Sequence, residues 1–95
     1  MEIPDGYFGA IYPRSGLATK RGLRLANCVG VVDSDYRGEI IVALHNDSTK
    51  TQSVELRDRI AQMVIQPYER PQVFDVVNEL SDTERGSGGF GHTGK

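Results

Sequence analysis

The groups best suited to binding chemistry are concentrated at the C-terminal end of this 95-residue chain. Five of the eleven glycines lie within residues 86–94, and Arg85 and Lys95 place positive charge at either end. Because glycine carries no side chain, consecutive backbone N–H groups can converge there on an anion such as a phosphate, with Thr93 adding a hydroxyl. Phe90 has no core to join among these glycines, and its flat ring suits stacking on a nucleobase. The alternative is a flexible, solubilising end in which the phenylalanine has no role.

A second candidate for anion binding lies early in the chain, around Arg14 and Ser15. A strand is expected to end at Pro13, and the free N–H groups that open the following short helix can hold an anion. The Ser15 hydroxyl and the Arg14 guanidinium would add hydrogen bonds to it. A capped turn with a surface arginine explains the same residues equally well.

The segment Asp33–Gly38 offers a carboxylate for acid–base chemistry. It opens like a calcium-binding loop, but Arg37 occupies a ligand position and Leu44 stands where the loop needs a bidentate glutamate, so calcium is not expected. A hairpin turn is the ordinary interpretation. The alternative is a carboxylate that orients and deprotonates a water molecule. Asp33 is the better candidate for that base, because it directly follows the apolar run Val29–Val32 and is expected to be shielded.

Gln62 is a polar residue in the middle of the apolar segment Ile60–Ile65, on the same expected face as Ile60 and Val64. A buried amide without a partner costs about 1–3 kcal/mol, so its side chain must form a hydrogen bond. The partner is either a backbone group in the core or a polar ligand on this face.

Short strands separated by turns, with one short helix, are expected to position these residues. The strands are expected in apolar, β-branched runs at Gly6–Ile11, Leu23–Leu25, Val29–Val32, Glu39–Leu44, Ile60–Ile65 and Val73–Val77. The helix is expected at Ser15–Arg21, closed by Gly22. This pattern predicts an all-β sandwich or barrel over residues 1–80 and a mobile glycine-rich tail over residues 81–95.

Composition narrows the class of protein. The net charge of −2 gives no basic surplus for binding nucleic acid. No apolar run approaches the roughly 20 residues that span a bilayer, and Met1–Asp5 lacks the features of a signal peptide. The single cysteine, Cys28, excludes an internal disulfide and, with His45 and His92, is too isolated for a structural zinc site. A cytoplasmic protein that binds neither nucleic acid nor a membrane is expected.

Taken in order, these segments resemble the trimeric dUTP diphosphatases (dUTPases). That family carries five motifs, and four of them are recognised here, at Pro13–Ala18, Gly30–Gly38, Asp58–Met63 and Arg85–Gly94. The resemblance implies a jelly-roll or β-clip fold, a homotrimer with shared active sites, and hydrolysis of dUTP to dUMP and pyrophosphate with Mg²⁺ held mainly through the substrate phosphates. That reaction removes dUTP and supplies dUMP for dTTP synthesis.

The resemblance also implies a role for each matching residue. Asp33 would activate the water that attacks the α-phosphorus, Tyr36 would lie under the deoxyribose, and Asn27 would read the uracil edge. The other substrate-binding residues would be Arg14, Ser15, Gly16 and Gln62 around the phosphates, Phe90 over the uracil, and Arg85, Gly91 and Thr93 elsewhere in the tail.

The chain departs from the family pattern in two places. The first family motif, an Ala-Gly-x-Asp stretch whose Asp helps to hold the water shell of the metal, has no counterpart and is expected upstream of Met1, with the opening strands. The chain taken alone is therefore expected to have impaired metal binding or stability. Arg57 replaces the glycine that usually begins the fourth motif, which weakens the case for the family's turn at that point.

Two other functions stay open at the level of sequence. A non-catalytic nucleotide sensor, or an inactive remnant of the family, is suggested by the absent first motif. A dCTP deaminase shares the fold but acts on the base, and the segment from Asp33 to Tyr36 together with Phe90 favours the diphosphatase.

Overall fold

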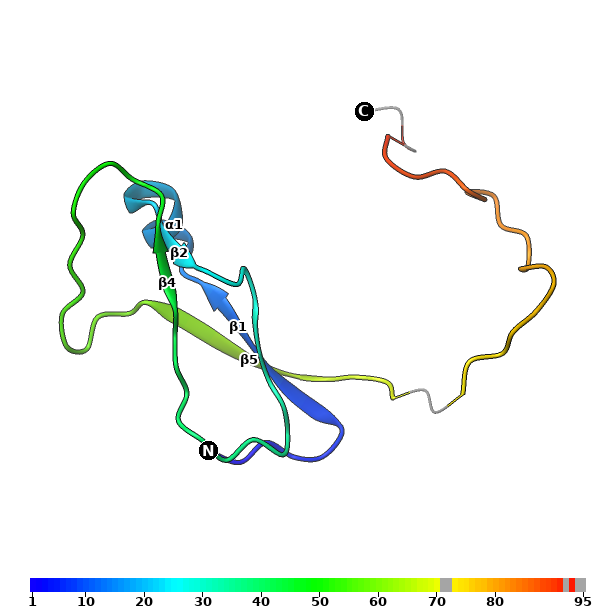
Figure 1. The fold of residues 1–95 in the computed structure, drawn as a ribbon, viewed down its shortest axis with the longest axis horizontal. Coiled ribbons are helices and arrows are strands. Elements are labelled where there is room, and N and C mark those ends of the chain that lie inside the picture. The colour runs from blue at the N-terminus through cyan, green and yellow to red at the C-terminus, as the bar shows by residue number, and fades with distance from the viewer. Residues whose placement is uncertain (71–72, 92, 94–95) are drawn as a thin grey trace.

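The chain forms two small antiparallel sheets and one short helix (Figure 1), seen in a computed structural model that describes residues 1–70, 73–91 and 93. The elements follow in chain order as β1 (Tyr7–Pro13), α1 (Ser15–Arg21), β2 (Leu23–Leu25), β3 (Gly30–Val32), β4 (Leu44–Asn46) and β5 (Ala61–Pro67). Strands dominate the regular structure, which confirms the expected all-β class.

The larger sheet has the strand order β3-β1-β5, with both neighbouring pairs antiparallel. Gly9 in β1 lies opposite Val32 on one side and Ile65 on the other. Because successive side chains of a strand point to opposite faces, Val32 enters the core, whereas Val31 remains 63% exposed on the outer face. The central strand β1 therefore fixes the register of the two strands that hold most of the candidate site.

The core lies between this sheet and the smaller sheet, in which β2 pairs with β4. Four buried residues form its centre: Ile3, Ile11, Leu25 and Val32. Partly buried Ile40, Val42, Leu44, Ala61 and Met63 pack against them. Gly9 is required here by close approach, since a Cβ at that position would lie 3.0 Å from the sulfur of Met63 and 3.1 Å from Cδ1 of Ile3.

The helix α1 begins and ends where the sequence predicts. It follows Arg14, whose backbone is extended (φ −84°, ψ 125°), and it has no side-chain cap. Gly22 ends it in the left-handed region (φ 71°) and donates its N–H to the carbonyl oxygen of Ala18 over 3.2 Å. Glycine adopts this conformation without the steric cost that a Cβ brings, so Gly22 acts as the expected stop signal.

Two predicted strands are wrong. Of the segment Glu39–Leu44, only Leu44 belongs to a strand. The residue before it, Ala43, accepts one backbone hydrogen bond at its carbonyl oxygen, from the N–H of Ala26 over 2.9 Å. Val73–Val77 belongs to no sheet. Both segments have the β-branched composition of strands, but a strand also needs a hydrogen-bonded neighbour, and the described residues supply none.

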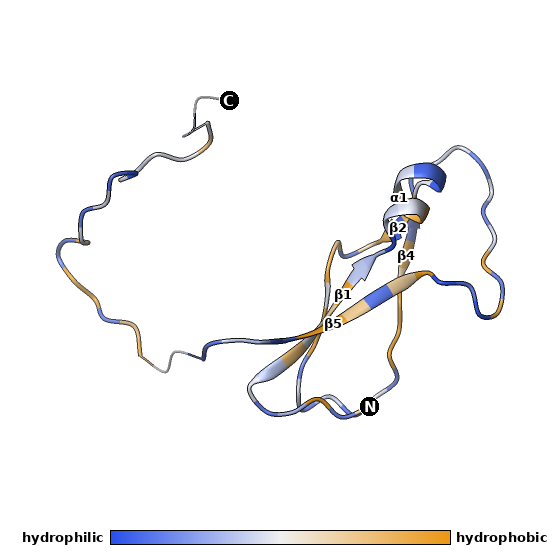
Figure 2. Ribbon diagram, turned by 180° about the vertical axis from the view of Figure 1, so that it is seen from behind, coloured by the Kyte–Doolittle hydropathy of each residue, from blue (hydrophilic) through white to orange (hydrophobic). Residues whose placement is uncertain are grey.

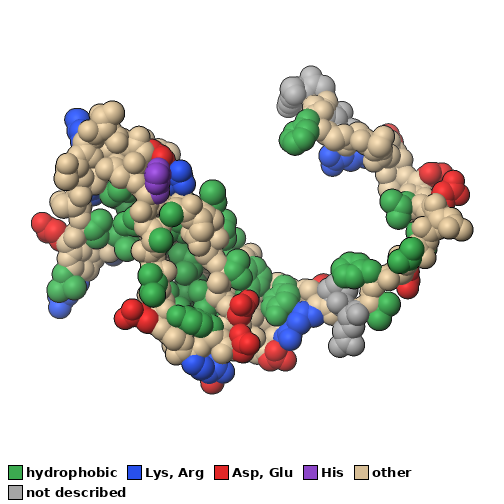
Figure 3. All heavy atoms as spheres, viewed as in Figure 1, with side chains coloured by type: hydrophobic (Ala, Val, Ile, Leu, Met, Phe, Trp, Pro, Cys, Tyr) green, Lys and Arg blue, Asp and Glu red, His purple; other side chains and the backbone are tan. Residues whose placement is uncertain are grey.

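Apolar side chains remain exposed on the outer face of the larger sheet and along residues 73–80. Figure 2 shows apolar residues in β5 and again, beyond a hydrophilic stretch, in this C-terminal segment, and Figure 3 shows hydrophobic side chains at the surface along that segment. Val64 is 44% exposed, Phe74 81%, Val76 99% and Leu80 85%. Monomeric soluble proteins rarely expose apolar surface on this scale, so these two regions have the character of contact surfaces.

Candidate functional site

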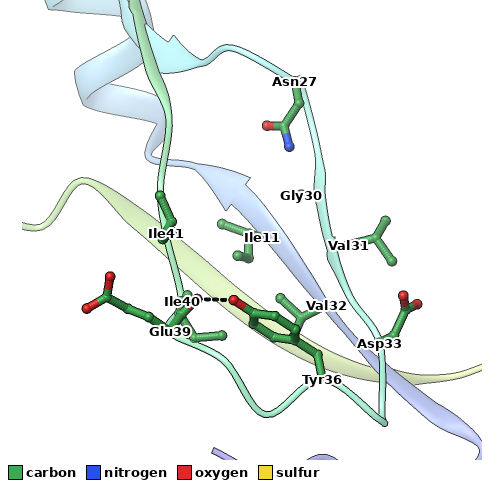
Figure 4. Close-up of a pocket in the computed structure, with 10 residues that line it drawn as sticks. All are labelled: Ile11, Asn27, Gly30, Val31, Val32, Asp33, Tyr36, Glu39, Ile40 and Ile41. Atoms are coloured by element: carbon green, nitrogen blue, oxygen red, sulfur yellow. Dashed lines mark hydrogen bonds between the residues drawn. The ribbon is translucent and has the colours of Figure 1, made fainter.

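A cavity of about 240 Å³ brings Asp33 together with Asn27 and Tyr36 (Figure 4). We call it the Asp33 cavity. Its wall comes from β1, from the turn between β2 and β3, and from the loop that follows β3, with Gly30 and the apolar Ile11 also lining it. The sequence-predicted grouping of these three polar residues is therefore present in one cavity.

The loop after β3 is held in shape by its own hydrogen bonds. The N–H of Tyr36 donates to the carbonyl oxygen of Asp33 over 3.1 Å, and the Tyr36 hydroxyl donates to the carbonyl oxygen of Glu39 over 2.6 Å. The Arg37 guanidinium donates to the carbonyl oxygen of Ser34 over 2.7 Å. These contacts hold both ends of Tyr36 and make the segment a turn that presents functional side chains.

The expectation that Asp33 is shielded is wrong. Its side chain is exposed, and in Figure 4 the carboxylate points away from the Tyr36 ring, on the same side as Val31. The cause is strand alternation: Val32 points into the core, so its neighbours on both sides point outward. Asp33 also borders a second, more apolar hollow lined by Phe8, Val31 and Tyr68.

Asn27 is held in a tight turn between β2 and β3. Its carbonyl oxygen accepts the N–H of Val29 over 2.7 Å, and Cys28 between them has a positive φ of 63°. This geometry leaves the Asn27 side chain exposed at the rim of the Asp33 cavity, where its amide can meet a ligand edge.

A second cavity, of about 400 Å³, collects the residues expected around an anion. We call it the Arg14 cavity, and its lining consists of Arg14, Ser15, Gly16, Leu17, Arg59 and Gln62. No carboxylate belongs to this lining, and among the described residues neither Arg14 nor Arg59 forms an ion pair. Two guanidinium groups beside a hydroxyl and an amide suit a polyanion such as a phosphate chain.

Gln62 lies in this cavity, but it is not buried. Within β5 the inward side chains are Ala61 and Met63, so Gln62 faces outward with Val64. Its Nε2 atom donates to the carbonyl oxygen of Pro13 over 3.0 Å, so the predicted backbone partner exists outside the core. That bond fixes the amide between β5 and the end of β1.

Arg59 is the site residue that the sequence reasoning missed. It lines the Arg14 cavity and also an adjoining apolar hollow with Ile11, Ile40 and Met63. The available signal was a basic residue three positions before Gln62, just ahead of an apolar strand.

The turn before β5 holds Arg57, where the family resemblance implies a glycine, in a left-handed backbone conformation. Arg57 has a positive φ of 73°, the region in which glycine is favoured. The N–H of Asp58 donates to the carbonyl oxygen of Glu55 over 3.1 Å, and the N–H of Glu55 donates to the Asp58 carboxylate over 2.9 Å. The arginine therefore occupies a conformation that suits glycine better.

The C-terminal residues of the predicted site lie apart from both cavities. Phe90 is fully exposed, and neither it nor Arg85, Gly91 or Thr93 lines the Asp33 or the Arg14 cavity. Arg85 donates from Nε to the carbonyl oxygen of Gly88 over 2.6 Å, which closes a small local turn. His92 and Lys95 lie outside the described residues. One chain thus presents the predicted site in three separate parts.

The described ranges give no protein-only metal centre. Within residues 1–70, 73–91 and 93, no three His, Cys, Asp or Glu side chains gather closely enough to hold an ion. The same residues include no helix with the length and apolar character needed to cross a membrane.

Comparison with known proteins places the chain in a family. A family model described as dUTPase matches residues 1–94. A relative named deoxyuridine 5'-triphosphate nucleotidohydrolase, from Finegoldia magna, is 50% identical over 94 residues, which cover 99% of this chain and 65% of the relative. The protein of the same name from Nautilia profundicola is 53% identical over 95 residues, covering 100% of this chain and 66% of the relative. The chain thus spans slightly less than two thirds of these two relatives.

Solved structures agree with this likeness. The dUTPase of Staphylococcus bacteriophage 80alpha, solved with dUpNHpp, is 28% identical with a TM-score of 0.73, covering 96% of this chain and 69% of that one. A mutant of the same phage protein, also with dUpNHpp, has a TM-score of 0.74 at 27% identity, covering 97% of this chain and 69% of that one. The likeness confirms the expected dUTPase-like jelly-roll fold. With a family model that spans all but the final residue and relatives at half identity, the chain belongs to the dUTPase family.

Proposed function

We propose that this protein hydrolyses dUTP to dUMP and pyrophosphate, and so removes dUTP and supplies dUMP for dTTP synthesis. The observation that carries the proposal is the Asp33 cavity, which two turns of a dUTPase-family chain line with Asp33, Tyr36 and Asn27. The two relatives described above are named for action on deoxyuridine 5'-triphosphate.

In the proposed reaction Asp33 is the general base. Its carboxylate takes a proton from a water molecule as the water oxygen bonds to the α-phosphorus of the substrate. The bond from the α-phosphorus to the oxygen that bridges to the β-phosphorus breaks, and pyrophosphate leaves with that oxygen. The exposed position of Asp33 gives water access to it, and a closing segment is needed to exclude bulk solvent during the reaction.

Asn27 and Tyr36 give the proposed site its selectivity. Asn27 pairs with the edge of the uracil, where uracil presents an acceptor in place of the amino group of cytosine. The Tyr36 ring lies under the deoxyribose and leaves no room for a 2′-hydroxyl. Mispaired buried polar groups are costly, so a fixed edge of this kind discriminates strongly between bases.

The Arg14 cavity and the C-terminal residues bind the phosphates in this proposal. Ser15, Gly16 and Gln62 hydrogen-bond phosphate oxygens, while Arg14 and Arg59 neutralise their charge. Phosphoryl transfer depends on positioning and charge neutralisation more than on covalent help, which is what these groups offer. The tail residues complete the site: Arg85, Gly91 and Thr93 at the phosphates and Phe90 over the uracil.

Mg²⁺ enters the proposal with the substrate. The described residues do not fit a protein-held Mg²⁺ site, since no three ligating side chains gather. Mg²⁺ is commonly bound by substrate phosphates together with one or two carboxylates, so the triphosphate itself is the proposed carrier of the ion.

We further propose that three copies of the protein assemble and share their active sites. The Asp33 cavity and the Arg14 cavity have no lining residue in common, and the tail residues line neither. The exposed apolar side chains of the outer face, such as Val31 and Val64, supply surface for such an assembly. Sites made from different copies would bring the three separated parts together.

Two measurements on the protein produced from its complete reading frame test the proposal. In the first, release of pyrophosphate and dUMP from dUTP supports the hydrolase. Release of ammonia from dCTP instead would favour a deaminase, and tight dUTP binding without turnover would favour a nucleotide sensor.

The second measurement tests shared sites by mixing. Asp33→Asn and Ser15→Ala each damage a different part of the site. After the two variants are denatured together and refolded, shared sites predict that part of the activity returns, because some sites combine an intact Asp33 with an intact Ser15. If the mixture stays as inactive as the separate variants, the parts come from one copy and the proposed assembly is wrong.

A further inference from the structure

Gly38 and Tyr36 occupy the same small volume beside the Asp33 cavity. A Cβ built on Gly38 would lie 2.5 Å from Cζ and 2.7 Å from Cε1 of Tyr36, and nearer still to the hydroxyl oxygen. Real Cβ atoms essentially never come within 3.0 Å of another heavy atom. The Tyr36 ring therefore lies directly over the backbone of Gly38, two residues later in the chain.

The backbone at Gly38 does not itself require glycine. Its φ lies outside the left-handed region, unlike that of Gly22 or Gly6. Among the described residues, the three atoms nearest to such a Cβ all belong to the Tyr36 ring and its hydroxyl, so it is this ring that excludes a larger residue there. The Tyr36 hydroxyl donates to the carbonyl oxygen of Glu39 over 2.6 Å, and Glu39 directly follows Gly38. The ring therefore passes over Gly38 to reach its hydrogen-bond partner.

We propose that Gly38 is a positioning residue for Tyr36: the missing side chain lets the ring fold back over the loop and reach Glu39, and this sets the ring in the wall of the Asp33 cavity. The inference rests on the proposed function, in which that ring excludes ribonucleotides. The inference adds to that function Gly38, as the residue that determines the position of the Tyr36 ring. Alanine at position 38 would push the ring out of its place and break its bond to Glu39.

The test compares Gly38→Ala with the wild type in two ways. A crystal structure of the variant is expected to show the Tyr36 hydroxyl displaced from the Glu39 carbonyl oxygen. Kinetics with dUTP and UTP, which differ only in the 2′-hydroxyl, are expected to show selectivity for dUTP reduced by about tenfold or more. The thermal midpoint separates this effect from general unfolding.

Tyr36→Ala provides the matched background. If Gly38 acts through Tyr36, adding Gly38→Ala to Tyr36→Ala changes the selectivity no further. An equal loss in both backgrounds, or a Gly38→Ala structure with Tyr36 unmoved, overturns the inference. If Tyr36 moves but the wild-type protein does not hydrolyse dUTP, the proposed function fails while the positioning role stands.

Discussion

The backbone N–H of Tyr36 donates directly to the carbonyl oxygen of Asp33, over 3.1 Å. This single bond closes a turn that carries both the carboxylate and the aromatic ring of the Asp33 cavity. Their relative position is therefore set by local chain geometry rather than by contacts between distant elements. A site built this way keeps its acid and its ring together even where the surrounding sheet is only partly covered.

Asp33→Asn is expected to remove turnover while leaving substrate binding nearly intact. The amide cannot accept the proton of the attacking water, and loss of a general base typically lowers the rate by about 10²- to 10⁴-fold. Steady-state pyrophosphate release gives kcat, and isothermal titration with dUTP gives the affinity. Asp35→Asn is the control, because Asp35 is an exposed carboxylate of the same turn that lines neither named cavity. Wild-type turnover in Asp33→Asn would contradict the assignment.

Arg59→Gln is expected to weaken binding of dUTP without weakening binding of deoxyuridine. Hydrogen bonds to charged groups contribute about 1.5–3 kcal/mol, so the loss in dUTP affinity should reach at least tenfold. Titration with both ligands measures it. Arg21→Gln carries the same charge change but lies elsewhere, where its guanidinium donates to Gln52 and to the carbonyl oxygen of Ser53. Equal effects of the two substitutions would show that Arg59 acts only through net charge.

A local signal in the sequence is enough to predict the helix, and the family resemblance predicts the grouping of several site residues. Gly22 ends α1 because its φ of 71° suits glycine, and that requirement is readable from one residue. Asn27, Asp33 and Tyr36 share a cavity because they lie in adjacent turns of one stretch of chain. Arg14 and Gln62, which the resemblance places around the phosphates, also share a cavity, through the pairing of β1 with β5.

Non-local pairing and the facing of side chains were not predictable in the same way. The segments Glu39–Ala43 and Val73–Val77 have strand composition, but no described segment pairs with them as a strand. For Asp33 and Gln62, burial depends on which face of the sheet is covered, and a one-residue step reverses that face. Composition alone cannot decide either point.

Asp47→Asn is expected to lower stability at neutral pH and to lose that effect in acid. The hydrogen bond from Arg24 to Asp47, at 2.6 Å, holds the pKa of this carboxyl below its usual value of 3.8. Since the unfolded chain then binds the proton more readily, the pair stabilises the fold above pH 3.8. The contribution is lost as the pH falls through the lower folded-state pKa.

Thermal unfolding of the wild type and Asp47→Asn from neutral to acid pH measures this effect. The two midpoints should differ at pH 7 and converge in acid. The difference at pH 7 should be modest, because both partners of the pair are exposed to solvent. Asp35→Asn, which removes a carboxylate outside the described ion pairs, should show no such convergence. A gap between wild type and Asp47→Asn that persists below the folded-state pKa would contradict the role of the pair.

Arg57→Gly is expected to stabilise the protein, because Arg57 holds a φ of 73° in the turn before β5. The left-handed conformation costs a residue with a Cβ about 1–2 kcal/mol, and glycine avoids that cost. Glycine also loses more backbone entropy on folding, which offsets about 0.5–1 kcal/mol of the gain in stability. The net result is a rise in the thermal midpoint of a few degrees, measured by calorimetry. Arg57→Ala removes the same charge but keeps the Cβ, so its midpoint should not rise. A gain shared by both variants would trace the effect to the charge and would show that the turn holds no strain at this position.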